Sequence, residues 1–269
     1  MNILRKLQQR WKNGDENLIS LLVRPLTWLN VSYHFSRKYA VLEDTWDYLI
    51  ILDACRFDTF KKINTIPGKL SKKTSKGTHT VEWSKKNFEG NNCSDIIYIS
   101  GNPQVSHYKV DRWQGGNPFR KLVDLWVDDW SDNYGTVMPD VITKATIKEI
   151  EQNDRKDVRF IMHYLQPHYP FVGKIKPKTP NPDNKSNISY YRYVQKTEGS
   201  LQGVIKAYES NLEYILPYIE DLIKHIPKGK KIVVTADHGE VFGEWGIHSH
   251  PPYIYLNELV TVPYLEVRT

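Results

Sequence analysis

The sequence predicts an α/β protein, a three-layer α/β/α sandwich built around a mainly parallel sheet. Continuous apolar runs of strand length occur at residues 46–53, 96–100, 158–164 and 232–236. Such unbroken runs are typical of strands that are buried on both faces of a sheet. Helical patterns separate these runs, and strands that alternate with helices favour parallel pairing with helices on both faces.

The elements between the apolar runs are predicted as follows. Residues 80–88, 142–152 and 201–225 have helical patterns, and the last of these ends before Pro227 and Gly229, which do not continue a helix. A fifth apolar run, residues 260–267, contains Pro263. Because proline cannot donate a hydrogen bond to a neighbouring strand, this run is expected at an edge of the sheet. Residues 174–189, which are rich in Pro, Asn, Lys and Ser, are expected to form a surface loop or lid.

Length and composition favour a single large globular domain. The chain has 269 residues, of which 40% are hydrophobic and 25% charged, as in ordinary folded proteins. Residues 1–45 are expected to form a helical segment that packs on the main domain, residues 46–269.

The charge balance favours an anionic partner. The net charge is +6 and the pI is near 9.0, but the lysines lie in separate clusters at residues 69–76, 174–178 and 228–231. No nucleic-acid-binding motif accompanies them, so we expect no nucleic acid partner and instead a phosphorylated or sulfated substrate.

Cysteine usage favours a cytoplasmic protein. Cys55 and Cys93, the two cysteines, form no CxxC pair and no disulfide framework. No transmembrane span is expected, because the apolar stretch at residues 18–31 is broken by Arg24 and Pro25.

Residues 3–12 form an amphipathic pattern near the start of the chain. Leu4, Leu7 and Trp11 fall at helical spacing among basic residues. This pattern favours a helix that docks on the main domain, and peripheral contact with a membrane surface through the same face is the alternative.

Several polar residues stand where a predicted strand ends. Asp53, Asn102, His168 and the pair Asp237-His238 all have this position. Residues far apart in sequence converge at the carboxyl edge of a parallel sheet, and carboxylate with imidazole is a ligand set suited to Zn²⁺ or Mn²⁺. The alternative for Asp237-His238 is a turn in which Asp caps the next helix.

A candidate nucleophile lies in the segment Ser75-Lys76-Gly77-Thr78-His79-Thr80-Val81-Glu82-Trp83, where a glycine-containing turn leads into a helix. A threonine hydroxyl attacks well only when its alkoxide is stabilised, and a metal ion and a helix amino terminus both provide this. The alternative for Thr78 is an ordinary N-cap.

These residues together resemble the alkaline phosphatase superfamily, in its sulfatase-like and phosphoglycerol-transferase-like branch. The resemblance rests on an apolar strand that ends in Asp53, a hydroxyl nucleophile after it, Pro167-His168-Tyr169-Pro170, Ala236-Asp237-His238-Gly239-Glu240, and His250-Pro251 before a Val-Pro strand. It covers about residues 46–266. It implies an alkaline-phosphatase-like fold.

The resemblance also implies roles for these residues. Asp53, Asp237 and His238 would bind one divalent metal, and Thr78 would complete the ligand set and act as nucleophile. Thr78 is preferred because Thr78-His79-Thr80-Val81-Glu82-Trp83 is similar to the Thr-Ser-Asp-Ala-Glu-Phe pattern of phosphoglycerol transferases. Thr80 is the second choice.

A second metal is left open by the sequence. His168 and His250 would either hold it or contact the substrate and leaving group, and His248 is an alternative to His250 in the same turn. The two-metal members of the superfamily usually have an aspartate where this chain has Tyr164.

Other polar residues have two interpretations each. Arg56 is a candidate for binding a substrate oxyanion, or else forms an ion pair with Asp58 or Glu82. Asn102 is a candidate for substrate contact, or only part of a Gly-Asn-Pro turn. His163 is interpreted as a core histidine.

Three tryptophans are candidates either for packing or for binding a sugar. Trp113, Trp126 and Trp130 are interpreted as core or lid residues, with a sugar-binding cleft as the alternative.

The function predicted from these features is metal-dependent hydrolysis of a phosphoester, or transfer of its phosphoryl group, through a covalent phosphothreonine. The substrate would be an anionic glycan, lipid or small-molecule ester. Cys55 lies in Asp-Ala-Cys-Arg and Cys93 in Asn-Cys-Ser-Asp, and neither fits the Cys-x-Pro-Ser-Arg motif of formylglycine sulfatases. A sulfatase is therefore the alternative among enzymes, and a catalytically idle, anion-binding member of the superfamily is the alternative outside them.

Overall fold

The computed structural model describes residue 27 and residues 38–153, 157–175 and 202–269. The segment 3–12, most of the segment 1–45 and most of the loop 174–189 lie outside the described residues, so the predictions for them, including the domain boundary, stay predictions. Within the described residues, no helix combines the length and the apolar character needed to cross a membrane.

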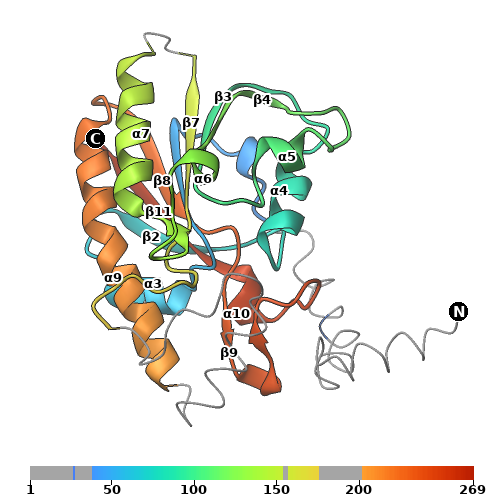
Figure 1. Cartoon of the computed structure of the whole chain (residues 1–269), viewed down its shortest axis with the longest axis vertical. Helices are drawn as coiled ribbons and strands as arrows, with labels where there is room; N and C mark the ends of the chain where they lie inside the picture. The colour runs from blue at the N-terminus through green and yellow to red at the C-terminus, as the bar shows by residue number, and fades with distance from the viewer. Residues whose placement is uncertain (1–26, 28–37, 154–156, 176–201) are drawn as a thin grey trace, which may run out of the picture.

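A seven-stranded sheet forms the centre of the molecule (Figure 1), with the strand order β2-β11-β8-β1-β7-β3-β4. Strand β1 pairs in parallel with β7 and β8, and β3 pairs in parallel with β7 and β4. Strand β11 is antiparallel to both of its neighbours. The strands are β1 (Tyr48–Leu52), β2 (Lys69–Thr74), β3 (Cys93–Ser100), β4 (Phe119–Asp124), β7 (Arg159–Tyr164), β8 (Lys231–Thr235) and β11 (Thr261–Arg268).

Helices cover both faces of this sheet, so the predicted three-layer α/β/α sandwich is confirmed. On one face α3 (Phe57–Ile63), α7 (Pro139–Glu151) and α9 (Gln202–His225) pack, and on the other α4 (Thr80–Phe88) and α5 (His107–Val110). Shorter elements are η2 (Val41–Glu43), α6 (Leu125–Asp128), β5 (Trp130–Ser131), β6 (Thr136–Val137), β9 (Val241–Phe242), η3 (Glu244–Gly246), β10 (His248–Ser249) and α10 (Asn257–Val260).

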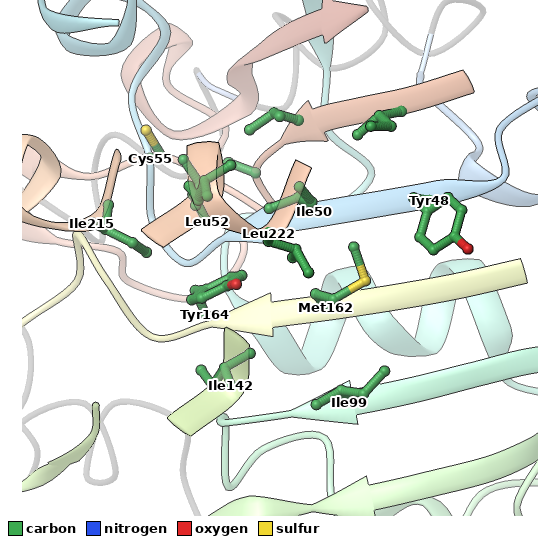
Figure 2. Packing of buried hydrophobic residues seen from close by; sticks show 14 of the residues in the cluster. Tyr48, Ile50, Leu52, Cys55, Ile99, Ile142, Met162, Tyr164, Ile215 and Leu222 are labelled. Carbon is green, nitrogen blue, oxygen red and sulfur yellow. The ribbon is translucent and has the colours of Figure 1, made fainter. Parts of the chain in front are cut away.

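Side chains alternate along the central strands between the two faces. Ile50 and Leu52 of β1 join the core under α7 and α9, whereas Leu49 and Ile51 join the core under α4. Figure 2 shows the first of these cores, in which Tyr164 at the end of β7 lies beside Leu52. Unbroken apolar runs are needed because both faces are buried.

All five apolar runs are confirmed as strands, but the edge position predicted for the run with Pro263 is wrong. Strand β11 lies inside the sheet, and β2 is the edge strand beyond it. The proline is accommodated in an antiparallel pairing, where its carbonyl oxygen accepts a hydrogen bond from the Thr235 hydroxyl at 2.6 Å.

The sheet brings several strand ends together at its carboxyl edge. The amide of Asp53, just after β1, donates to the carbonyl of Tyr164 at 3.0 Å, and the amide of Gly101, just after β3, donates to the carbonyl of His163 at 3.0 Å. The segments that follow β1, β3, β7 and β8 therefore lie side by side.

Candidate metal centre

A first group of possible metal ligands comprises Asp53, His163 and Asp237, whose ligand atoms lie within 4.8 Å of one another. All three residues are buried. Oδ1 of Asp53, Nε2 of His163 and Oδ2 of Asp237 have no hydrogen-bond partner among the described residues. Buried polar atoms without partners are costly, so this group fits a divalent cation that binds them.

His238 faces this first group through Nε2. Its Nδ1 lies 2.7 Å from the carbonyl oxygen of Gly239, to which it donates. The proton is therefore on Nδ1, and Nε2 lies 3.3 Å from Oδ2 of Asp237 and 3.5 Å from Oδ1 of Asp53. A hydrogen bond at one ring nitrogen commonly orients a histidine whose other nitrogen binds a metal.

Hydrogen bonds fix the carboxylates of the first group. Oδ1 of Asp237 accepts the amides of Ala54 at 3.1 Å and His238 at 2.9 Å, which leaves Oδ2 for a cation. The amide group of Asn102 donates to Oδ2 of Asp53. Ala54 has φ of 58°, a left-handed conformation that costs free energy in a residue other than glycine and occurs most often at functional sites.

The charge on the first group is unfavourable in the absence of a cation. Burial, and then the neighbouring Asp237 carboxylate, raise the pKa of Asp53 well above its usual range. Burial lowers the pKa of His163 to about 4 and that of His238 well below its usual value. Neutral imidazole is the form that binds a metal, and a cation would stabilise the ionised carboxylates.

A second group comprises His168, Glu240 and His250, with ligand atoms again within 4.8 Å of one another. Nδ1 of His168 donates to the carbonyl oxygen of Tyr169, and Nδ1 of His250 lies 3.3 Å from both carboxylate oxygens of Glu240. The two groups are adjacent, because the ring centroid of His250 lies 4.7 Å from that of His238 and 5.0 Å from that of His168.

Burial and charge act in opposite directions in the second group. Burial, followed by repulsion from His250, lowers the pKa of His168 to about 4. Burial would also lower the pKa of His250, but the Glu240 carboxylate outweighs it and the pKa is raised. Burial raises the pKa of Glu240, and the attraction of His250, with that of the other two histidines, outweighs it, so the net pKa is lowered.

The loop that carries His168 is held from two sides. The backbone amide of His168 donates to the carbonyl of Asp53 at 3.2 Å. From α9, the side-chain amide of Asn211 donates to the carbonyls of Pro167 at 3.1 Å and His168 at 3.2 Å. The second group is therefore anchored to the strand end that carries the first.

The structure places Thr80, not Thr78, beside the first group. Thr80 is the first residue of α4, and its hydroxyl lies 3.4 Å from Nε2 of His238 and 3.5 Å from the side-chain amide of Asn102. The hydroxyl also lies at a helix amino terminus, where backbone amides favour negative charge.

Thr78 has other contacts. Its hydroxyl donates to the Glu82 carboxylate at 3.1 Å and accepts the amide of Tyr253 at 2.9 Å. Gly77 before it allows the turn, because a Cβ atom at this position would lie 2.4 Å from the backbone nitrogen of Trp83. Thr78 therefore connects the turn before α4 to the segment that follows His250.

The remaining candidates are placed as follows. Arg56 forms ion pairs with Asp58 and Glu244, each at 2.6 Å, so we assign it no contact with substrate. The second group contains His250 rather than His248. Trp113 is buried in the core under α4, and Trp126 and Trp130 pack against the other core.

Two members of these groups had no metal role in the sequence interpretation. Glu240 stands in the Ala-Asp-His-Gly-Glu segment and lies with His168 and His250. Tyr164 packs in the core, with its hydroxyl 2.9 Å from that of Thr143. His163 lies inside an apolar strand, and its Nδ1 is 2.8 Å from the Tyr98 hydroxyl. No signal in the surrounding sequence distinguishes a core histidine from one that faces a cation.

The chain is similar to known proteins in its structure but not detectably in its sequence. No family model matches the sequence, and no curated protein matches it significantly. The soluble domain of lipooligosaccharide phosphoethanolamine transferase A from Neisseria meningitidis is similar, with a TM-score of 0.59, 13% identity, and coverage of 81% of this chain and 75% of that one.

Two further structures are similar over most of this chain. The C-terminal periplasmic domain of EptC from Escherichia coli, in complex with zinc, has a TM-score of 0.53 and 12% identity, and the match covers 84% of this chain and 74% of that one. A putative sulfatase from Bacteroides thetaiotaomicron has a TM-score of 0.53 and 11% identity, with coverage of 84% and 65%. The chain thus has the alkaline-phosphatase-like fold that its sequence motifs predicted, shared with a phosphoethanolamine transferase and a sulfatase.

Proposed function

We propose that this protein catalyses metal-dependent transfer of a phosphoryl or substituted phosphoryl group, with Thr80 as nucleophile. The observation that carries the proposal is the position of the Thr80 hydroxyl, at the start of α4 and 3.4 Å from Nε2 of His238, beside two buried carboxylates that each have one oxygen without a hydrogen-bond partner in the described part of the chain. This replaces the assignment of the nucleophile to Thr78, whose hydroxyl is bonded to Glu82 and Tyr253.

The two groups have different roles in this proposal. Asp53, Asp237, His238 and His163 hold one divalent cation, and His168, Glu240 and His250 hold a second. The cations, zinc or manganese, would stabilise the threonine alkoxide and the charge on the phosphate oxygens. A zinc complex of a structurally similar domain supports zinc.

The reaction proceeds in two displacements. The Thr80 oxygen forms a bond to phosphorus as the bond to the leaving oxygen breaks, and the hydroxyl proton is lost to solvent. Amides at the start of α4 stabilise the transferred group. Water or a second alcohol then attacks phosphorus, the bond to the Thr80 oxygen breaks, and a proton from the attacking group restores the hydroxyl. Attack by water makes the protein a hydrolase, and attack by an alcohol makes it a transferase.

The comparisons support phosphoester transfer or sulfate-ester hydrolysis in general. The similar structures include a phosphoethanolamine transferase and a putative sulfatase. We favour phosphoesters because both cysteines are buried in the core, and neither lies at the start of α4.

The cytoplasmic location expected from the cysteines finds no support in these comparisons. One of the similar domains is described as periplasmic. We therefore propose a periplasmic or membrane-associated location, which fractionation of the native cells would test.

The test is a kinetic comparison of Thr80→Ala and Thr78→Ala. With zinc or manganese bound, wild type should hydrolyse 4-nitrophenyl phosphate or bis(4-nitrophenyl) phosphate faster than 4-nitrophenyl sulfate. Thr80→Ala should lower kcat by about 1,000-fold or more, whereas Thr78→Ala should retain most of it.

Three outcomes would contradict the proposal. Full activity in Thr80→Ala would exclude this nucleophile, and preference for the sulfate would indicate a sulfatase. Absence of turnover of all three esters in the metal-loaded wild type would favour the idle, anion-binding alternative.

A further inference from the structure

Arg56 is the N-cap of α3, at the end of the loop that follows β1, and its side chain reaches the hairpin formed by β9 and β10. Its side chain is only 11% exposed, and a buried guanidinium is stable only when its hydrogen bonds are satisfied. Its partners therefore show what it holds in place.

The guanidinium contacts both segments. On the α3 side, Nε and Nη2 donate to the two carboxylate oxygens of Asp58 at 2.9 and 2.6 Å. On the hairpin side, Nη1 donates to the Glu244 carboxylate at 2.6 Å and to the carbonyl of Glu240 at 3.2 Å. The ring centroid of Phe242 lies 5.3 Å from the guanidinium carbon. Paired, charge-assisted hydrogen bonds of this kind fix orientation as well as position.

The hairpin carries two ligands of the second group. Glu240 immediately precedes β9 and His250 immediately follows β10. Glu244 also closes the turn between these strands, because its carboxylate accepts the amide of Phe242 at 2.6 Å. A shift of the hairpin would therefore move both ligands.

The backbone of Arg56 is linked by hydrogen bonds to the first group. The Arg56 amide donates to the Tyr208 hydroxyl at 2.9 Å, and that hydroxyl donates to the Ala54 carbonyl at 2.6 Å. Ala54 follows Asp53 directly, and its own amide donates to the Asp237 carboxylate. Arg56 is thus joined to the first group through short hydrogen bonds.

We propose that Arg56 is a positioning residue that sets the distance between the two metal-binding groups by anchoring the hairpin at Glu244 and Glu240. The inference rests on the proposed function, in which both groups bind cations. Two cations act on one phosphate only when they are about 4 Å apart, so the hairpin has to be held closely.

The test uses Arg56→Met and Glu244→Gln. The second change removes only the negative charge that pairs with Arg56 on the hairpin side, at a residue whose side chain is 30% exposed, so it should fold even if the first does not. Arg159→Met is the matched control, because Arg159 pairs with Asp95 at 2.7 Å and lies 4.4 Å from the Trp46 ring, away from both groups.

Zinc titration of the metal-free proteins provides the first measurement. Wild type and Arg159→Met should bind two zinc ions. Arg56→Met and Glu244→Gln should bind one as tightly as wild type and the other at least about 10-fold more weakly. Wild-type affinity for both ions in the two variants would overturn the inference.

Hydrogen exchange of residues 241–249 in the metal-free proteins provides a second measurement that does not depend on zinc. Exchange should be faster in Arg56→Met and Glu244→Gln than in wild type and Arg159→Met, and unchanged exchange would overturn the anchoring role. Fewer than two zinc ions in wild type would instead overturn the proposed metal centre, and with it the role of Arg56 in spacing the metals.

Discussion

Thr78 and Thr80 differ in their contacts although one residue separates them. Similarity to the phosphoglycerol-transferase sequence pattern favoured Thr78. The structure at the start of α4 shows instead that the Thr80 hydroxyl is the one that lies near His238. His79 is the N-cap, so Thr80 begins the helix and lies beside the strand ends. Where a helix begins, and which way each hydroxyl then points, depends on packing that the sequence does not reveal.

Asp53 provides a prediction on pH dependence. Burial and the Asp237 carboxylate raise its pKa in the metal-free fold above the unfolded value, so the folded state loses stability as pH rises from about 4 towards the folded pKa. Asp53→Asn removes this loss. In EDTA, Tm of Asp53→Asn minus Tm of wild type should therefore increase between pH 4 and 7.5, measured by thermal unfolding.

Asp47→Asn serves as a control with the opposite sign. Burial would raise the pKa of Asp47, but hydrogen bonds from Lys230 and from the Lys231 amide outweigh it and lower the pKa. The folded state therefore gains stability from Asp47 as pH rises from its folded pKa to the unfolded value of about 4. The Tm of Asp47→Asn minus that of wild type should therefore decrease over that low range and stay nearly constant from about pH 5 to 7.5. A difference for Asp53→Asn that does not change with pH would contradict the account of Asp53.

Some of the proposed ligands were predictable from residue type and position. Asp53, Asp237, His238 and His168 each follow a buried apolar run, and parallel pairing brings them to one edge. His163 was not predictable in the same way, because a histidine inside an apolar strand looks the same whether it packs or faces a cation.

Among the elements, the segment after β8 depends on close backbone approach. A Cβ atom at Gly239 would lie 1.9 Å from the carbonyl oxygen of Glu258 in α10. Gly239→Ala must therefore displace the segment that carries Asp237, His238 and Glu240. We expect a loss of about 1–3 kcal/mol in unfolding free energy and weaker zinc binding, measured by denaturant unfolding and zinc titration.

Gly90→Ala is the matched control. A Cβ atom at Gly90 would meet nothing within 4 Å, although its φ of 74° makes alanine strained. This variant should lose some stability and bind zinc as wild type does. Wild-type zinc affinity in Gly239→Ala would show that the segment tolerates the displacement and would refute the prediction.

The central elements were predictable and the edge strands were not. Strands β1, β3, β7 and β8 are buried on both faces, so their sequences contain continuous apolar runs. Strand β2 is largely exposed and reads Lys-Leu-Ser-Lys-Lys-Thr, and β4, at the other edge, contains Phe119, Leu122 and Val123 among charged residues. Exposed strands carry little hydrophobic signal, so Pro263 was misread as the mark of an edge.

At the scale of the whole molecule, the proposed centre depends on three strands and one helix that meet at one edge of the sheet. Strands β1, β8 and β7 bring Asp53, Asp237 and His168 to this edge. Helix α4, which covers the face of the sheet opposite α7 and α9, brings Thr80 to the same edge. No single segment contains both the nucleophile and the proposed cation ligands. We therefore expect the proposed covalent chemistry at Thr80 to require the native, metal-loaded protein.

The most direct measurement locates the phosphoryl group after reaction. Zinc-loaded protein is mixed with 4-nitrophenyl phosphate, quenched in acid during turnover and cleaved after lysine, and the peptide of residues 77–85, which contains Thr78, Thr80 and Ser84, is fragmented by mass spectrometry. The account predicts phosphate on Thr80, and none when zinc is removed beforehand. Phosphate on Thr78, or turnover with this peptide unmodified, would contradict it.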